Sequence, residues 1–300
     1  MLITLGMVWG AAFMATKVAT ADFGAFAIAG LRLALAAVAI NILRAIVGEA
    51  LPGLRTPEDR RFWVFALAVA LTANAVPFSL LSWAQAHIDS ALAGVLMTTV
   101  PFFVLPLGHV FVAGERMTLR KTAGFTLGFG GVAVLIGPDA VFGLGSGGSV
   151  AILAQLACLT VALCYAAGSI TSKRAPDRGL IAFSTAALSL AAAITMPLAL
   201  ALDDTLQVMP SWQAVAAIAY LGLVPTAFAT VMLFAVIRSA GPGFLALVNY
   251  QVPVWAVIFG AVFLGETPSP RLGIALVMIA AGLAVSQGLL GLRRGGHAHG

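Results

Sequence analysis

Charged residues are scarce in this sequence: of its 300 residues, 9% are Asp, Glu, Lys or Arg, whereas 61% are hydrophobic. Soluble domains carry about a quarter charged residues, so this composition excludes a water-soluble fold. A helix needs about twenty apolar residues to cross the ~30 Å hydrocarbon core of a membrane. Because such stretches fill almost the whole chain, we expect an all-α integral membrane protein.

Short polar breaks divide the sequence into ten apolar stretches, and each predicts a transmembrane helix. A Gly- and Ser-rich connecting loop at 138–148 separates five helices from five, which predicts one five-helix repeat at 1–137 and a second at 149–290. Residues 291–300 are expected to form a flexible cytoplasmic tail. The first stretch lacks a basic start and a clear cleavage site, so it is interpreted as a retained helix and not as a signal peptide. The expected helices are 2–20, 24–46, 62–84, 90–113, 119–137, 149–171, 179–201, 212–237, 242–264 and 270–290.

Lys and Arg are distributed unevenly over the loops between these helices. If the N-terminus is cytoplasmic, the inner side holds thirteen of the 16 basic residues and the outer side holds Arg271 alone, while Lys17 and Arg32 lie within spans. Short cytoplasmic loops accumulate Lys and Arg, so the count predicts that both termini are cytoplasmic. The inner residues are Arg44, Arg55, Arg60, Arg61, Arg116, Arg120, Lys121, Lys173, Arg174, Arg178, Arg238, Arg293 and Arg294.

The two halves of the chain resemble each other in sequence. Residues 101–120 align with 253–271, each beginning with proline and containing a Gly-Glu pair, and residues 9–17 align with 165–173. Each half has an odd number of helices, so the second half must enter the membrane in the opposite orientation. The result is an inverted repeat, which is common in secondary transporters that alternate between two open states.

Several motifs resemble those of the EamA-type members of the drug/metabolite transporter (DMT) superfamily. They are the W-G-x-x-F pattern at residues 9–13, the Leu-Arg pair at 31–32 and the Pro, Gly-Glu, Arg and Gly segment that occurs in both halves. The resemblance spans essentially the whole chain and is closest to bacterial inner-membrane exporters of amino acids and related metabolites. It implies a multi-pass carrier in the lipid bilayer that binds a small-molecule substrate. We expect a monomer that requires no cofactor or metal and binds no nucleic acid.

In the fold that this resemblance implies, the first, third, fourth, sixth, eighth and ninth helices line a central cavity. Polar and aromatic residues within those spans are therefore candidates for substrate binding. Asn249 has an alternative role as a hydrogen-bonding contact between helices. Trp9 and Tyr165 have an alternative role in the aromatic belt at the membrane interface. The candidates are Trp9, Asn74, Phe78, Ser79, Met97, Thr98, Tyr165, Asn249, Tyr250 and Gln251.

Prolines, closely spaced glycines and the two cysteines also have expected roles. Pro101 and Pro253 hold matching places beside the polar candidates, and each removes a backbone hydrogen bond, which predicts hinges; static kinks are the alternative. The pairs Gly6 and Gly10, and Gly124 and Gly128, are each four residues apart and predict close helix contact within one subunit. The cysteines, at 158 and 164, are interpreted as packing residues.

Acidic residues are absent from the middle of the expected spans, since all eleven fall in loops or at span ends. Proton-coupled carriers often keep an acidic relay there, so we favour gradient-driven facilitation. His109 is the one titratable candidate for proton coupling, and a buried neutral histidine is the alternative. Lys17 is expected to snorkel outward. Arg32 is expected to pair with carbonyl groups or to reach the outer surface.

The sequence therefore favours export of small amphiphilic metabolites, above all neutral or aromatic amino acids, by alternating access. Multidrug efflux would require an anionic cavity. A sugar-phosphate or nucleotide-sugar carrier would require cationic partners, and Lys17 and Arg32, the two that qualify, are expected nearer the outer edge than the midplane. An intramembrane enzyme would need a nucleophile and base, or metal ligands, facing each other. A receptor or scaffold would bind its ligand without flux.

Overall fold

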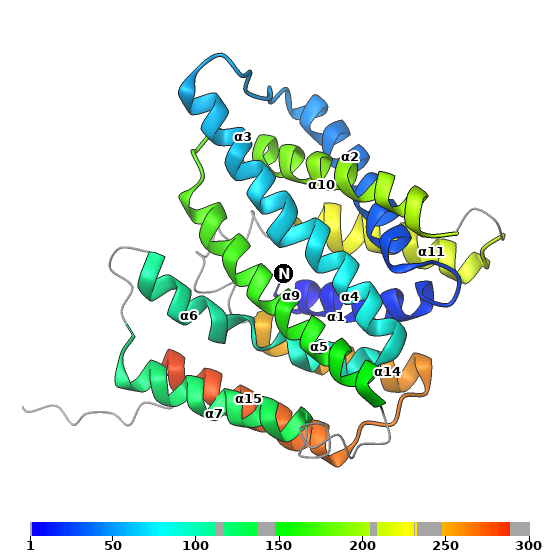
Figure 1. The fold of residues 1–300 in the computed structure, drawn as a ribbon, viewed down its shortest axis with the longest axis vertical. Coiled ribbons are helices and arrows are strands. Elements are labelled where there is room, and N and C mark those ends of the chain that lie inside the picture. Colours follow the sequence, from blue (N-terminus) through cyan, green and yellow to red (C-terminus); the bar gives the residue numbers. More distant parts are fainter. Residues whose placement is uncertain are drawn as a thin grey trace, which may run out of the picture.

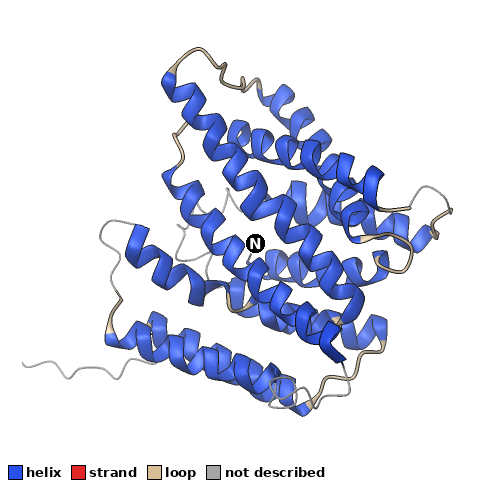
Figure 2. Ribbon diagram, in the orientation of Figure 1, coloured by secondary structure: helices blue, strands red, loops and turns tan. Residues whose placement is uncertain are grey.

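The computed structural model describes residues 2–111, 117–136, 148–204, 209–230, 232 and 248–288. Every regular element among these residues is a helix (Figure 2). Each of the ten predicted spans contains a described helix, which confirms the predicted all-α membrane class. Five helices are long and apolar enough to cross a membrane, and four shorter apolar helices accompany them. The five are Ala25–Val47, Pro57–His87, Ser90–Phe111, Ser149–Arg174 and Leu180–Leu202.

The helices follow the predicted spans closely. The third span begins at Pro57 instead of residue 62, because Thr56 and Asp59 form a reciprocal capping box around that proline. The first half contains α1 (Leu2–Ala19), α2 (Ala25–Val47), α3 (Pro57–Val69), η1 (Ala70–Ala75), α4 (Val76–His87), α5 (Ser90–Met97), α6 (Val100–Phe111) and α7 (Leu119–Ile136). The second half contains α9 (Gly148–Arg174), α10 (Leu180–Leu202), α11 (Trp212–Leu221), η2 (Gly222–Phe228), α14 (Val248–Leu264) and α15 (Pro270–Gln287).

Helix pairing follows the symmetry of an inverted repeat, in which exchanging the two halves leaves the pattern of helix contacts unchanged. The fifth and tenth spans, α7 and α15, pack on each other, as do the second and seventh, α2 and α10. These two pairs lie at opposite ends of the view in Figure 1, with α1, α4, α9 and α14 between them. The contact of α1 with α14 corresponds to that of α9 with α6 when the halves are exchanged. The central helices therefore meet their neighbours across the two repeats.

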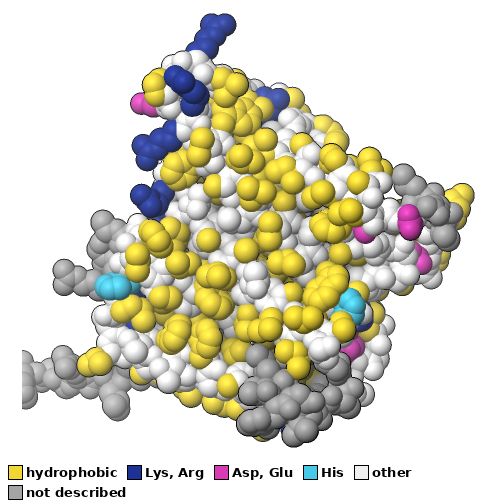
Figure 3. Space-filling view, in the orientation of Figure 1, with side chains coloured by type: hydrophobic (Ala, Val, Ile, Leu, Met, Phe, Trp, Pro, Cys, Tyr) yellow, Lys and Arg dark blue, Asp and Glu magenta, His cyan; other side chains and the backbone are white. Residues whose placement is uncertain are grey.

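Charged side chains gather at the two ends of the helices. In Figure 3, Lys and Arg occur mainly along the left edge, Asp and Glu mainly along the right edge, and hydrophobic side chains cover the surface between them. Each described carboxylate lies in a loop or in the first turn of a helix. The middle of the described spans therefore contains no acid, as the sequence predicts.

The third and eighth spans each contain a π-helical segment, which the sequence analysis did not predict. The first, η1, ends two residues before Pro77, and the second, η2, contains Pro225. Both prolines follow a valine, Val76 and Val224, so the two prolines hold matching places in the repeats, although η1 lies before its proline and η2 surrounds its own. Proline offers no N–H to the carbonyl one turn earlier. A π-helical turn is one way in which a helix continues past such a gap, and these turns often occur at functional sites.

The fourth span was predicted as one helix but is divided into α5 and α6 by a turn at Thr98 and Thr99. Pro101 follows directly and provides no N–H for the carbonyl of Met97. The two threonine hydroxyls donate to carbonyls three residues earlier, at 2.6 Å for Thr98 and 2.7 Å for Thr99. Local hydrogen bonds of this kind compete with the helical ones. The predicted fourth span is confirmed at Ser90–Phe111, but its helix is interrupted at this point.

Close glycine packing joins α7 to α15. A β-carbon placed on Gly282 would lie 2.6 Å from both the carbonyl oxygen of Gly124 and the backbone nitrogen of Gly128. The predicted close contact at Gly124 and Gly128 is thus confirmed, and it lies within one chain.

We expect Gly282→Ala to destabilise the fold, because the atoms in the way belong to the backbone and the helices must separate. The expected loss is about 1–3 kcal/mol in the free energy of unfolding. Thermal unfolding of the purified protein in detergent measures it. Gly273→Ala, in the same helix, is the control, because nothing lies within 4 Å of its added carbon. Equal unfolding temperatures for the two variants would contradict this account of the packing.

Candidate substrate-binding site

Side chains of the third and eighth spans meet at Arg32 of α2: the sequence candidate Phe78, and Thr226, which the sequence analysis did not single out. The Arg32 side chain is buried, with 7% of the residue exposed. Its Nε donates a hydrogen bond of 2.7 Å to Thr226 Oγ1 in η2, and its guanidinium carbon lies 3.8 Å from the centre of the Phe78 ring in α4. Thr226 and Phe78 both directly follow the matched Val-Pro pairs of the two repeats. Arg32 therefore contacts both halves at once.

The sequence of η2 explains why the Thr226 hydroxyl is available to Arg32. Pro225 has no N–H, so the carbonyl of Leu221, four residues earlier, loses its α-helical donor. Thr226 Oγ1 donates to that carbonyl at 2.8 Å. With its hydrogen committed, the hydroxyl oxygen accepts from Arg32. The proline thus fixes the orientation of the hydroxyl that holds the arginine.

Two hydrogen bonds join α1 to the eighth span beside this cluster. Trp9 Nε1 donates to the carbonyl of Pro225 at 3.3 Å, next to Thr226. The Tyr220 hydroxyl donates to the carbonyl of Val8 at 3.0 Å. Trp9 is half-buried and bonded to the opposite half of the protein. Its interpretation as a substrate-binding residue stays a prediction.

Tyr165 of α9 connects the arginine cluster with the apolar interior. It packs against one buried cluster that includes Phe78 and against another that includes Cys158. Tyr165 and Tyr220, both of the second repeat, lie in the neighbourhood of Arg32. Aromatic residues from both repeats are therefore placed around one buried cation.

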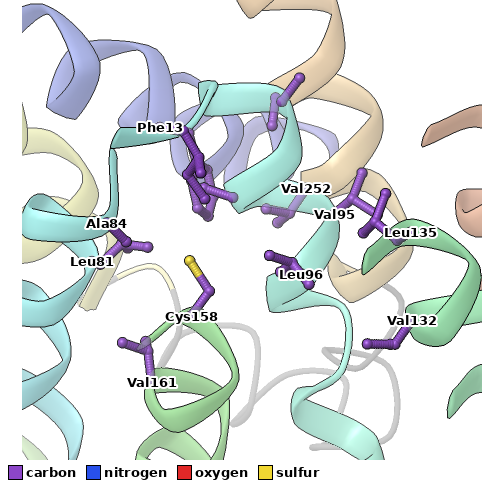
Figure 4. Close-up of a cluster of buried hydrophobic side chains, with 14 of the residues drawn as sticks. Phe13, Leu81, Ala84, Val95, Leu96, Val132, Leu135, Cys158, Val161 and Val252 are labelled. Atoms are coloured by element: carbon purple, nitrogen blue, oxygen red, sulfur yellow. The ribbon is translucent and has the colours of Figure 1, made fainter. Parts of the chain in front are cut away.

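Cys158 belongs to the apolar cluster between α5, α9 and α14 (Figure 4). The close-up shows Cys158 and Val161 on α9, with Leu96 and Val252 on the facing helices. Cys158 is a buried free thiol, in accordance with its predicted packing role. Met97 packs against the same cluster.

Three polar candidates form hydrogen bonds within their own span. Asn74 Nδ2 donates to the carbonyl of Val69 at 3.3 Å. Ser79 Oγ donates to the carbonyl of Ala75 at 2.9 Å. Thr98 is buried, and its Oγ1 donates to the carbonyl of Val95 in α5 at 2.6 Å. These bonds use the hydroxyl donors of Ser79 and Thr98 and one of the two amide donors of Asn74, and the binding role of the three residues stays a prediction.

The candidates of the ninth span lie at the start of α14. Asn249 and Tyr250 fall in its first turn, and their side chains lie outside the described part of the protein. Gln251 packs against Gly6 of α1, where an added β-carbon would lie 2.8 Å from the β-carbon of Gln251. Pro253 lies inside the continuous helix, whereas Pro101 follows the break between α5 and α6. The two predicted hinges therefore have different local structures.

The structure gives specific contacts for the two embedded cations. Lys17 is half-buried, and its Nζ donates to the carbonyl of Gln85 at 2.7 Å and to that of Ile88 at 3.0 Å, at the end of α4, so the expected outward snorkelling stays a prediction. A cation there is favourable because a helix C-terminus is partly negative. Arg32 is buried and does not reach the outer surface, and its contacts within the described residues are with Thr226 and Phe78 and not with carbonyl groups. The sequence identified Arg32 as embedded and placed it nearer the outer edge than the midplane, but it did not identify these partners.

The alternative interpretation of His109 as a buried residue does not hold. The residue is exposed near the end of α6, and the backbone N–H of Met117 lies 3.3 Å from its Nδ1. Its candidacy for proton coupling stays a prediction.

Carboxylates from the loops of each half bind helix starts of the other half. Glu266 accepts from the backbone N–H groups of Ser90 and Ala91 at the start of α5, at 2.8 and 3.0 Å, and from the Ser90 hydroxyl at 3.0 Å. Asp22 accepts from the backbone N–H and hydroxyl of Ser211 before α11. These bonds from Ser211 hold the pKa of Asp22 below its usual value. The favourable charge at the helix start is therefore retained until the pH falls through this lowered pKa.

Asp203 extends this pattern to a third helix. It accepts from the backbone N–H of Ala27, at the start of α2, at 2.6 Å. All three carboxylates lie on the side that the charge distribution predicts to be the outer one. Sequence spacing did not identify these contacts, because each partner pair is more than 170 residues apart.

Comparison with known proteins agrees with this architecture. The profile of the EamA-like transporter family matches residues 1–137 and 152–287. The "Probable terminal-alkyne amino-acid exporter" of Streptantibioticus cattleyicolor is 29% identical, with 98% of this chain and 94% of that protein covered. The "Uncharacterized transporter YoaV" of Bacillus subtilis is 23% identical over 94% of each chain. A crystal structure of another protein shares the fold, with a TM-score of 0.69 and 21% identity over 96% of each chain.

The fold and these comparisons define a membrane transporter for small molecules. The chain belongs to the EamA-like transporter family, which confirms the resemblance drawn from its motifs. A further relative, the "Uncharacterized inner membrane transporter YedA" of Escherichia coli, is 24% identical over 93% of this chain and 86% of that protein.

Proposed function

We propose that this transporter exports small amphiphilic metabolites, above all neutral or aromatic amino acids, by alternating access of its two halves. The observation that carries the proposal is the cluster of Trp9, Phe78, Tyr165 and Tyr220 around a buried polar centre contributed by both repeats. Aromatic walls with a few hydrogen-bonding groups suit amphiphilic solutes. The exporter from Streptantibioticus supports an amino-acid substrate by similarity.

The same proposal includes the arrangement in the membrane. Residues 1–137 and 149–290 are taken as the two repeats, joined by 138–148 and followed by the tail 291–300. Both termini face the cytoplasm of a bacterial inner membrane, and the transporter acts as a monomer. The separation of basic and acidic edges in Figure 3 supports this orientation, because cytoplasmic loops are rich in Lys and Arg. Asn249 and Tyr250 remain part of the proposed binding site.

Counterflow in proteoliposomes tests the function. Purified protein is reconstituted and loaded with unlabelled amino acid, and the accumulation of the labelled form is followed for a panel of amino acids. We expect counterflow of several neutral amino acids, and net uptake into unloaded proteoliposomes that is insensitive to a proton ionophore, since the middle of the described spans contains no acid. Strict dependence on a pH gradient would refute the uncoupled mechanism. Absence of counterflow for the entire panel would refute amino-acid transport.

A further inference from the structure

The charge of Arg32 has no counter-ion among the described residues. The ion pairs of Arg178 with Glu58 and Asp59 lie at the end of the bundle, and no described carboxylate pairs with Arg32. A charge buried without a partner costs several kcal/mol. An ionisable group inside a membrane bundle therefore indicates function unless its partner is found. The missing partner is best supplied by a ligand.

The guanidinium group also has unused hydrogen-bond donors. An arginine side chain has five N–H donors. One of them, on Nε, is bonded to Thr226, and the four on the two Nη atoms have no acceptor within the described parts of the chain. These four include a parallel pair that matches the two oxygens of a carboxylate. The bond to Thr226 and the contact with Phe78 fix the plane of the group before a ligand arrives.

The local charge favours a monoanion. Lys17 is the other embedded cation of the first two spans, and its Nζ already binds the carbonyls of Gln85 and Ile88. One arginine neutralises one carboxylate, whereas a phosphate dianion would leave a buried negative charge. The surrounding rings, including those of Trp9 and Tyr165, suit an apolar body or, through cation–π contact, an ammonium group.

We propose that Arg32 binds the carboxylate of the transported solute, with Thr226 as the positioning residue for its guanidinium group. The inference rests on the proposed transport function and specifies its substrate class: amphiphilic molecules that carry one carboxylate. Amides and decarboxylated analogues of the same molecules are poor ligands.

Four probes test this assignment: L-leucine, 4-methylpentanoate, which lacks the amine, L-leucinamide, which lacks the carboxylate, and inorganic phosphate. Binding to the purified full-length protein is measured by thermal-shift titration, and leucine counterflow is measured in proteoliposomes. We expect wild-type protein to bind leucine and 4-methylpentanoate about 10- to 100-fold more tightly than leucinamide, the range for a charged hydrogen-bonded pair. Phosphate should not compete with leucine.

The variants separate binding from structural support. Arg32→Gln should bind both carboxylates, leucine and 4-methylpentanoate, about 10- to 100-fold more weakly than wild-type protein and should bind leucinamide with unchanged affinity. Without ligand it should unfold no earlier than wild-type protein, because it removes an uncompensated charge. Arg32→Lys keeps the charge without the planar guanidinium group, so its affinity for carboxylates should be intermediate. It replaces Arg32→Gln in the binding test if Arg32→Gln does not fold. Thr226→Ser should keep wild-type binding, whereas Thr226→Val should weaken it.

Each contrary outcome identifies which proposal fails. Equal binding of leucine and leucinamide by wild-type protein, or unchanged carboxylate binding by Arg32→Gln, overturns the role of Arg32 even if amino acids are transported. Competition by phosphate overturns the carboxylate assignment. Earlier unfolding of Arg32→Gln with unchanged leucine affinity shows a structural role alone. If no amino acid is transported while 4-methylpentanoate still binds in an Arg32-dependent manner, amino-acid export fails and the carboxylate site stands.

Discussion

Trp9→Ala should lower the rate of solute counterflow at least tenfold while leaving expression and membrane insertion intact. The substitution removes a ring that packs between the halves and a hydrogen bond to the Pro225 carbonyl. A large aromatic side chain provides 150–250 Å² of contact area, roughly, so its loss opens the wall of the site beside Thr226. Counterflow of the labelled amino acid, normalised to reconstituted protein, measures the effect.

Trp212 provides a matched control for this substitution. It begins α11 and is 76% exposed, so Trp212→Ala removes an indole ring of equal size outside the cluster. We expect near-wild-type counterflow for that variant. Trp9→Phe keeps a ring but not the indole N–H, and should give an intermediate rate. Normal counterflow by Trp9→Ala would remove Trp9 from the proposed site.

The second large effect concerns stability and the helix start at α5. Glu266→Ala should lower the free energy of unfolding by about 2–4 kcal/mol, because it leaves the N–H groups of Ser90 and Ala91 without their acceptor. Ser90 is fully buried, so water cannot replace the lost bonds easily. Thermal or denaturant unfolding of the purified protein measures the loss.

Asp89 is the informative control for Glu266. It occupies the N-cap position of α5, where sequence rules place the capping carboxylate, but its side chain makes no capping bond. Asp89→Asn should therefore change stability by less than about 0.5 kcal/mol, as for most surface substitutions. A larger loss from Asp89→Asn than from Glu266→Ala would show that the cap is local and does not come from the other half.

The spans and the family could be predicted from sequence because the bilayer imposes simple requirements. A helix that crosses the membrane must be about twenty apolar residues long. The Lys and Arg residues in short cytoplasmic loops set its orientation. Both are properties of contiguous segments. The helices therefore agree with the predicted spans within a few residues at most described ends, and the earlier start at Pro57 follows from a local capping box.

The features that sequence did not predict depend on contacts between distant segments or on backbone detail. The depth of Arg32 is set by Thr226, which lies 194 positions away along the chain. The cap on α5 comes from Glu266 across the repeat. Prolines signalled irregular helices, but not that η1 and η2 would be π-helical, nor that the fourth span would break at Thr98. Aligning Val76-Pro77 with Val224-Pro225 would have related Phe78 to Thr226, and thus pointed to the arginine site.

The central claim is that the solute passes between the two halves beside Arg32 and Thr226. Cysteine labelling tests it most directly, with Thr226→Cys introduced into a protein in which Cys158 and Cys164 are replaced by alanine. Ala191→Cys, at a fully buried position between α10 and α2, is the unlabelled control. We expect a membrane-impermeant maleimide to label the thiol at 226, and saturating L-leucine to slow that labelling. A thiol at 226 that stays unreactive in a transporting protein, or that reacts equally fast with and without solute, would contradict the account.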